Sequence, residues 1–187
     1  MAIRVYIDQG HNPKSPNTGA EGNGLKEQDI TYAVGQELYR RLSADPNYVT
    51  VLSRPTPDTQ LGVSNADSLR QRVIGAENFG ADLFLSLHTN AASDPSANGT
   101  EALVYAVNSR SGEIAEDILE EVVSLTGLRD RGVIARPGLY VLRRTSMPAV
   151  LLELGFITNP RDAAMMRDNP ALFAQGIYRG LNEYYGF

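Results

Sequence analysis

Cysteine is absent from this chain of 187 residues. Disulfide bonds and thiolate metal ligands are therefore excluded, and any bound metal ion must be held by His, Asp, Glu and water. No run of about 18 apolar residues is present, so the sequence predicts no membrane span. The start of the sequence also lacks the pattern of a secretory signal peptide. The 17 basic and 22 acidic residues give a net charge of −5, which argues against broad electrostatic binding to nucleic acid.

Histidine is scarce, and the positions of its two copies are informative. His11 follows the strand-like segment 3–8, and His88 follows the apolar run 83–87. A third apolar run, 149–152, is followed by Glu153. Open α/β sheets carry their chemistry at the carboxyl ends of parallel strands. If these runs are parallel strands, two imidazoles and a carboxylate converge on one edge of the sheet, which is a common arrangement for a catalytic zinc ion.

Strand-like and helix-like segments alternate along the chain, which favours an α/β domain with a largely parallel sheet. The predicted strands span residues 3–8, 48–52, 83–87, 100–107, 139–142 and 149–152. The predicted helices span 25–43, the segment between Ser64 and Gly80, 111–126, and two segments that begin at Asn159-Pro160 and Asn169-Pro170. Between 107 and 139 we expect one helix and a short loop. The prediction is a single domain over residues 1–187, with three α/β/α layers and a mostly parallel central sheet of about six strands.

The first candidate residues lie around a glycine- and asparagine-rich loop at 9–24. Its glycines permit unusual backbone angles, and they are Gly10, Gly19, Gly22 and Gly24. Such a loop can aim His11 into a cleft, although a solvated loop histidine is the alternative. His88 follows a buried strand, and its alternative is a structural histidine that forms hydrogen bonds at the end of that strand.

Two glutamates are candidates for the same site. Glu27 lies at the start of a predicted helix, where an acidic residue interacts favourably with the helix dipole even without a function. It also precedes Ile30 on the inward stripe of that helix, where a carboxylate needs a partner such as a metal ion. Glu153 interrupts the apolar segment 149–156, so it is either paired with an arginine or acts as an acid/base facing a cleft. Partial burial would raise its pKa towards the range useful for proton transfer.

A basic cluster occurs on this otherwise acidic chain. It contains Arg129, Arg131, Arg136, Arg143 and Arg144. These side chains are either surface arginines or a binding site for a substrate that carries carboxylates.

Four segments of the chain resemble the zinc-dependent N-acetylmuramoyl-L-alanine amidases of bacteria and their phages, in particular the type 3 amidase catalytic domain. Residues 7–11, Ile-Asp-Gln-Gly-His, resemble the Asp-Pro-Gly-His motif with which this domain opens. Residues 24–29 resemble the segment that carries the second metal ligand, and residues 72–91 the segment that carries the third. Residues 147–159 are similar to the segment with the catalytic glutamate. The resemblance covers nearly the whole chain.

The resemblance implies one zinc ion per chain, with His11, Glu27 and His88 as ligands and Glu153 as the catalytic acid/base. Gln9 replaces the usual proline of the first motif, and Asn12-Pro13 replaces the usual glycine pair after the histidine. Neither change removes a ligand. Asp8 or a backbone carbonyl is expected to orient the second nitrogen of His11, as metal-bound imidazoles usually require.

The implied reaction is hydrolysis of the amide bond between N-acetylmuramic acid and L-alanine of the peptidoglycan stem peptide. The expected partner is therefore peptidoglycan or a muropeptide, the expected site of action is the bacterial cell wall, and we expect a monomer. The predicted substrate contacts are Asn90, Glu101, Arg131 and Arg136. Two other functions use the same residues or the same fold: another zinc peptidase or deacetylase, and a catalytically inactive module that binds the cell wall.

Overall fold

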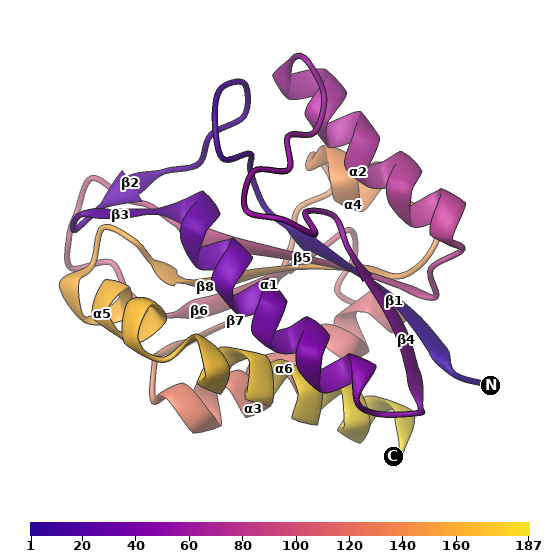
Figure 1. Cartoon of the computed structure of the whole chain (residues 1–187). Coiled ribbons are helices and arrows are strands. Elements are labelled where there is room, and N and C mark those ends of the chain that lie inside the picture. Colours follow the sequence, from indigo (N-terminus) through magenta and orange to yellow (C-terminus); the bar gives the residue numbers. More distant parts are fainter.

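The structure is a computed structural model that describes residues 1–187. A sheet of six strands runs through its middle (Figure 1). The strands lie in the order β4-β1-β5-β8-β6-β7. Their bounds are β1 (Ile3–Gln9), β4 (Tyr48–Leu52), β5 (Leu83–Asn90), β6 (Thr100–Val104), β7 (Asp130–Ala135) and β8 (Ala149–Phe156). The strands β4, β1, β5 and β8 are parallel, whereas β6 is antiparallel to β8 and β7 is parallel to β6. The predicted six-stranded, mostly parallel sheet is therefore confirmed.

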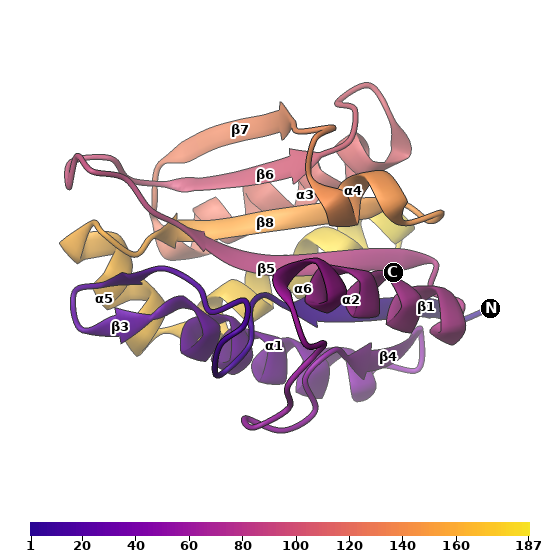
Figure 2. The same ribbon diagram turned by 90° about the horizontal axis from the view of Figure 1, so that it is seen from above.

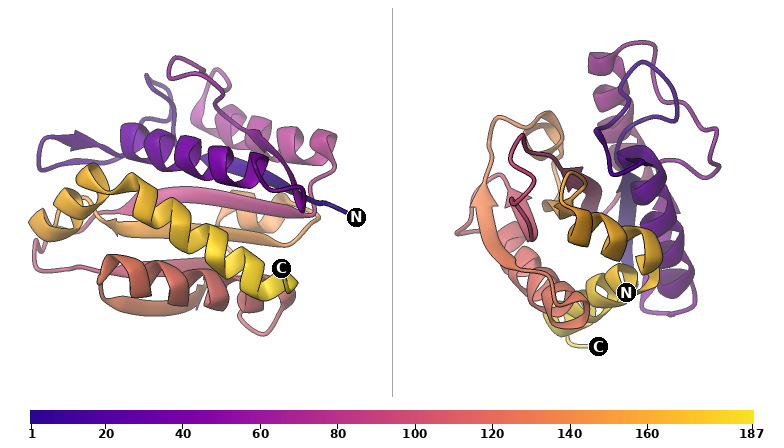
Figure 3. Two further views of the ribbon diagram at one scale, coloured as in Figure 1. Left: turned by 60° about the horizontal axis from the view of Figure 1, so that its bottom comes forward. Right: turned by 90° about the vertical axis from the view of Figure 1, so that its left-hand side faces the viewer.

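Helices cover both faces of this sheet. On one face, α1 (Glu27–Ser43), α6 (Pro170–Tyr185) and α3 (Arg110–Thr126) lie side by side, and α5 (Pro160–Asp168) precedes α6 (Figure 3). On the other face lie α2 (Asn65–Phe79) and the short α4 (Tyr140–Arg144) (Figure 2). A small hairpin of β2 (Glu21–Gly22) and β3 (Leu25–Lys26) precedes α1. None of these helices is both long enough and apolar enough to cross a membrane.

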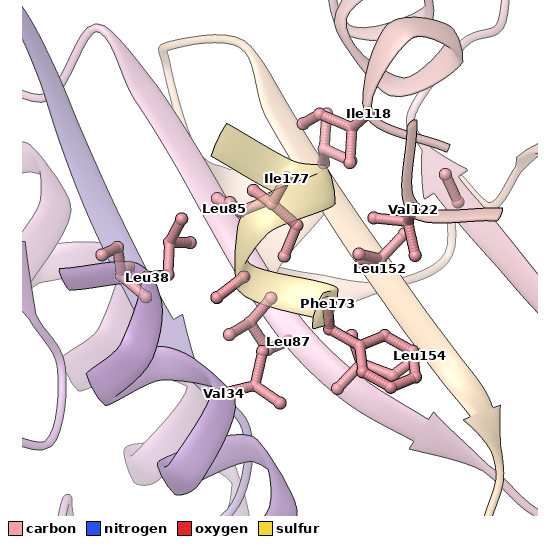
Figure 4. Packing of buried hydrophobic residues seen from close by; sticks show 14 of the residues in the cluster. Val34, Leu38, Leu85, Leu87, Ile118, Val122, Leu152, Leu154, Phe173 and Ile177 are labelled. Atoms are coloured by element: carbon pink, nitrogen blue, oxygen red, sulfur yellow. The ribbon is translucent and has the colours of Figure 1, made fainter. Parts of the chain in front are cut away.

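The two faces of the sheet carry cores of different size, because side chains alternate between the faces along each strand. Leu85 and Leu87 of β5 are fully buried under α1 and α6 (Figure 4), and together with Leu83 they belong to a cluster of 27 buried residues. Phe84 points to the other face and belongs to a cluster of only 10 buried residues under α2 and α4. The second face is therefore the one on which polar side chains of the sheet remain available.

A row of three polar residues continues that second face beyond its small core. His88 of β5 is in register with Glu153 of β8, and Glu153 is in register with Glu101 of β6. One step earlier along the strands, Ser86 is in register with Leu151, which belongs to the small core. The row thus lies where α2 and α4 no longer supply apolar partners, at the carboxyl ends of β5 and β8.

The segment 139–142 was expected to be a strand, and this prediction is wrong. Residues 140–144 form helix α4, with Val141 and Leu142 buried in the small core. A run of four apolar residues has no periodicity that distinguishes a strand from one turn of buried helix. The apolar residues of this segment therefore indicate that it is buried, but they do not indicate its backbone conformation.

The edge strand β7 was missed, because a loop was expected there. Its residues are Asp-Arg-Gly-Val-Ile-Ala, and none of them is buried. Gly132 has a φ of 85°, and the register between β6 and β7 shifts between Thr100 and Ala102. An exposed, irregular edge strand with charged residues lacks the alternation of apolar and polar residues that would identify it.

Helix α6 packs against α3 through its glycines. A Cβ atom at Gly176 would lie 2.6 Å from Val122 Cα, and a Cβ at Gly180 would lie 2.5 Å from Ile118 Cα. Both distances are shorter than a Cβ can tolerate, so the two helix backbones approach closely only because these positions lack a side chain.

We therefore expect Gly180→Ala to destabilise the protein. Alanine favours a helix by about 1 kcal/mol relative to glycine, whereas overpacking against a backbone costs roughly 1–3 kcal/mol. Because the added Cβ would meet backbone atoms of α3 and not a flexible side chain, we expect a cost at the upper end of this range, and urea unfolding should show a net loss of about 2 kcal/mol. Ser124→Ala, at an exposed position of α3, is the control and should cost nothing measurable. A Gly180→Ala protein as stable as the wild type would contradict the packing argument.

Candidate metal centre and active site

Three side chains from separate elements meet at the polar end of the second face. His11 comes from the loop after β1, Glu27 is the first residue of α1, and His88 lies in β5. His11 Nε2 lies 3.2 Å from Glu27 Oε2, and His88 Nδ1 lies 3.1 Å from Glu27 Oε1. One ligand atom of each residue lies within 4.8 Å of the others. The structure thus brings together the three residues expected to bind a metal ion.

Glu27 is the most firmly held of the three. Its Oε2 accepts a hydrogen bond from Ala20 N at 2.8 Å, and its Oε1 accepts one from Thr89 N at 2.9 Å. The residue is only 3% exposed. Burial by itself raises the pKa of the carboxyl, but hydrogen bonds to His11 and His88 outweigh this effect and hold it well below its usual range. Glu27 is therefore ionised at neutral pH, as a metal ligand must be.

Two glycines make room for these ligands. A Cβ at Gly10 would lie 2.6 Å from His88 Nε2, and a Cβ at Gly19 would lie 2.6 Å from Glu27 Oε2. Neither glycine has a positive φ; in this loop the left-handed conformation is adopted by Asn17, Asn23 and Gly24, and by His11 itself, with a φ of 65°. The expectation of unusual backbone angles is thus wrong for Gly10 and Gly19, whose contribution is the space that they leave free. His11, by contrast, is held in a conformation that is uncommon for residues other than glycine.

Asp8 does not orient His11, contrary to expectation. Its carboxylate accepts hydrogen bonds from Arg72 Nη1 at 2.6 Å and from Ser86 Oγ at 2.7 Å. Asp8 still belongs to β1 and points onto the sheet face, in register with Ser86, whereas His11 lies beyond the end of the strand. The sequence proximity of Asp8 and His11 therefore brings no contact between their side chains.

The donor set and its unsatisfied atoms fit a metal ion. The Nδ1 atom of His11 is buried and has no hydrogen-bond partner, and the same is true of Oε2 of Glu153. Buried polar atoms without partners are rare in proteins, and they occur here beside two imidazoles and an ionised carboxylate. Two histidines and one carboxylate are a ligand set of catalytic zinc sites, which keep a further position open for water or substrate.

Glu153 lies beside this cluster, where its carboxyl group could accept and donate a proton. Its neighbours in the sheet register are His88 and Glu101, and it forms no salt bridge, so the alternative of a structural pair with an arginine is excluded. Burial, together with the negative charges of Glu27 and Glu101, raises the pKa of Glu153 to about 8. A carboxyl group that titrates near neutral pH is suited to both accepting and donating a proton.

The predicted substrate contacts fall into two groups. Asn90 Nδ2 donates to Glu101 Oε1 at 3.0 Å, and Arg131 Nε donates to Glu101 Oε2 at 2.7 Å. Glu101 is therefore buried and paired, and the guanidinium of Arg131 also lies 4.9 Å from the centre of the Phe156 ring. These residues form a rim beside Glu153. Arg136 lies elsewhere: its backbone N donates to Val104 O at the far end of β6, roughly 10 Å along the strand from Glu101.

One residue at the site was not recognised from the sequence. Arg72 of α2 is 1% exposed, and it contacts Asp8 and the backbone of the loop that carries His11. The sequence does contain an indication of its role, because Arg72 shares the inward-facing side of its helix with Leu69, Val73 and Ala76. A charged residue on such a stripe needs a buried partner.

Together, the fold and the site are those of an α/β domain that carries, at one edge of its sheet, a His-Glu-His cluster consistent with a metal site and a free carboxyl group beside it. Comparison with known proteins makes this specific. The model of the Amidase_3 family, described as N-acetylmuramoyl-L-alanine amidase, matches residues 5–183, and the chain belongs to this family.

Curated relatives and a solved structure agree with this assignment. The chain is 36% identical over 189 residues to the N-acetylmuramoyl-L-alanine amidase LytC of Bacillus subtilis, covering 97% of this chain and 35% of LytC. It is 35% identical to CwlM of Bacillus licheniformis, covering 95% of this chain and 65% of CwlM. The catalytic domain of CwlV from Bacillus (Paenibacillus) polymyxa has a TM-score of 0.85 at 33% identity, with 98% of each chain covered. The chain thus spans about a third of LytC and less than two thirds of CwlM.

The raised pKa of Glu153 predicts how the stability of the metal-free protein depends on pH. The folded protein holds the proton of Glu153 more tightly than the unfolded chain does, so this contribution to stability is fully present below about pH 4.5 and is lost as the pH rises through about 8. Glu153→Gln removes the group that must ionise. The free energy of unfolding of this variant, relative to wild type, should therefore increase between pH 5 and pH 9 by on the order of 2–4 kcal/mol.

Denaturant unfolding of metal-free protein at several pH values measures this difference. Glu120→Gln, at an exposed position of α3, is the matched control for the loss of one carboxyl group. A difference between Glu153→Gln and wild type that stays constant from pH 5 to pH 9 would show that Glu153 is not held in its protonated form.

Proposed function

We propose that this domain hydrolyses the amide bond between the lactyl group of N-acetylmuramic acid and L-alanine of the peptidoglycan stem peptide. The observation that carries the proposal is the convergence of His11, Glu27 and His88 beside the unpaired Glu153, in a chain of the Amidase_3 family. Peptidoglycan as substrate places the reaction at the bacterial cell wall.

We assign His11, Glu27 and His88 as the ligands of a single zinc ion. Zinc supplies a Lewis acid, which makes a water molecule more acidic and stabilises negative charge that develops on a carbonyl oxygen. The protein contributes a ligand set that is already assembled, since Glu27 is fixed by two backbone N–H groups and lies against both imidazoles. Such prior organisation reduces the cost of ordering the ligands when the ion binds.

Glu153 moves the proton in the proposed mechanism. As a carboxylate, it accepts a proton from the attacking water at its free oxygen; as a carboxylic acid, it then donates this proton to the nitrogen of the leaving L-alanine. Its pKa is raised by burial and by two neighbouring carboxylates, and it would fall beside a divalent cation. The two effects therefore act on the pKa of Glu153 in opposite directions.

The rim formed by Asn90, Glu101 and Arg131 is our candidate for contact with the stem peptide. The side chain of Arg131 is 31% exposed, while its Nε is held by Glu101. Guanidinium groups bind carboxylates through paired, charge-assisted hydrogen bonds. In this arrangement Glu101 fixes the direction of Arg131 and Asn90, and these two side chains meet the substrate.

The first test combines metal content with product analysis. Wild type and Glu153→Gln should each bind about one zinc ion per chain, because Glu153 is not a ligand. Purified peptidoglycan treated with wild type should release N-terminal L-alanine, and the rate with Glu153→Gln should fall by about 10²–10⁴-fold. His88→Ala is the control that loses both zinc and activity.

Any other outcome of this test would contradict a particular part of the proposal. Bound zinc with newly formed amino termini other than L-alanine would indicate a peptidase, and bound zinc with released acetate would indicate a deacetylase. Bound zinc with no product would indicate an inactive wall-binding module. A wild-type protein that binds no zinc would overturn the ligand assignment itself.

A second test addresses the rim. Arg131→Ala should raise KM for muropeptides that carry stem-peptide carboxylates by roughly tenfold, which corresponds to the loss of one charge-assisted hydrogen bond. Arg136→Ala makes the same change at the other end of β7 and should leave KM unchanged. Equal effects of the two substitutions would show that general charge, and not a specific contact of Arg131, is responsible.

A further inference from the structure

Arg72 places a buried guanidinium beneath the loop that carries His11. Its Nη1 donates to Asp8 Oδ1 at 2.6 Å and to Gln9 O at 2.7 Å, and its Nη2 donates to His11 O at 2.6 Å. The side chain is only 2% exposed. It reaches these atoms from α2, which is more than 60 residues away in the sequence. One side chain thus connects the end of β1, the His11 loop and a helix on the second face.

The backbone that Arg72 holds is in an uncommon conformation. His11 has a φ of 65°, in the left-handed region that side chains other than glycine rarely adopt. Such a conformation persists only where the surrounding contacts impose it. The backbone carbonyl of His11 is the atom that Arg72 holds, so this hydrogen bond restrains the peptide unit adjoining the strained residue.

The anchors on either side of Arg72 are themselves fixed. Asp8, which pairs with the guanidinium, also accepts a hydrogen bond from Ser86 Oγ of β5 at 2.7 Å. Asn12, the residue after His11, is fully buried and donates to Pro16 O at 2.8 Å and to Leu61 O at 2.9 Å. The loop is therefore held at both ends, and Arg72 supplies the contact in the middle.

We propose that Arg72 is a positioning residue for the metal centre: it holds the His11 backbone in the left-handed conformation that turns the imidazole towards Glu27 and His88. The guanidinium has the fixed fork of donors that this task needs, because it must bind one carboxylate and two carbonyl oxygens at the same time. Lysine carries the same charge, but its ammonium group lacks this planar geometry. The inference rests on the proposed zinc ligands, and it adds that their arrangement depends on a residue that does not contact the ion.

Arg72→Lys is the test, with zinc affinity measured by competition with a chelator. Substitution of groups that orient metal ligands typically weakens metal binding by about 10–100-fold, and we expect a loss within this range. Arg54→Lys is the matched control. Arg54 is equally buried, but its side chain donates to Gln28 O and Pro57 O and does not contact the backbone of residues 9–12. The control should retain the zinc affinity of wild type.

A second measurement follows the imidazoles directly, without the metal. The chain has only two histidines, so their ring signals in an NMR spectrum of the metal-free protein are readily assigned. Arg72→Lys should shift and broaden the signals of His11, while those of His88, whose ring lies edge-on 4.9 Å from that of His11, should shift by a smaller amount. If Arg72→Lys does not fold, Ser86→Ala removes the hydroxyl donor to Asp8 and should change the His11 signals in the same direction, by a smaller amount.

The outcomes separate this inference from the proposed function. Unchanged zinc affinity and unchanged His11 signals in Arg72→Lys would overturn the positioning role. Equal losses of zinc affinity in Arg72→Lys and Arg54→Lys would also overturn it, because the cause would then be a general loosening of the core. A wild-type protein that binds no zinc would refute the proposed metal centre, while the His11 signals would still test whether Arg72 holds the loop.

Discussion

Glu27 places an ionised carboxylate at the point where three parts of the chain meet. The loop before α1 donates the backbone N–H of Ala20, β5 donates that of Thr89, and the imidazoles of His11 and His88 lie against the same two oxygens. A buried charge is tolerated only where it is fully paired, so this carboxylate constrains the loop, the helix start and the strand end together. The raised pKa of the neighbouring Glu153 follows in part from the same charge.

Much of the fold could be predicted from the sequence, because the strands that build the site have strong local signals. The run 83–87 is buried on both faces and lies in the middle of the sheet, and the strand at 48–52 was predicted with its bounds as observed. Local sequence patterns did not predict the secondary structure of segments whose backbone conformation depends on tertiary packing. The short segment at 140–144 became a helix, and the charged segment at 130–135 became an edge strand through pairing with β6 alone.

The residues of the candidate site also fall into those that the sequence predicts and those that it does not. His11, Glu27, His88 and Glu153 were identified because their residue types and their positions at element ends carry chemical information. The partners that hold them were not identified. Asp8, which was one of two groups expected to orient His11, in fact pairs with Arg72 of α2. Such pairings depend on which face a side chain occupies and on where α2 crosses the sheet. Neither is encoded in the spacing between neighbouring residues.

The reversed direction of β6 and β7 determines which loops surround the active site. Since β6 is antiparallel to β8, its first residues, and not its last, lie next to Glu153. Residues 91–99, which connect β5 to β6, and residues 127–129, which enter β7, therefore border the same edge as the loops that leave β1 and β8. The connections that leave β6 and β7 are on the opposite edge. Changes in loop length and sequence would thus affect substrate choice when they fall before these two strands, and they would leave it unaffected when they fall after them.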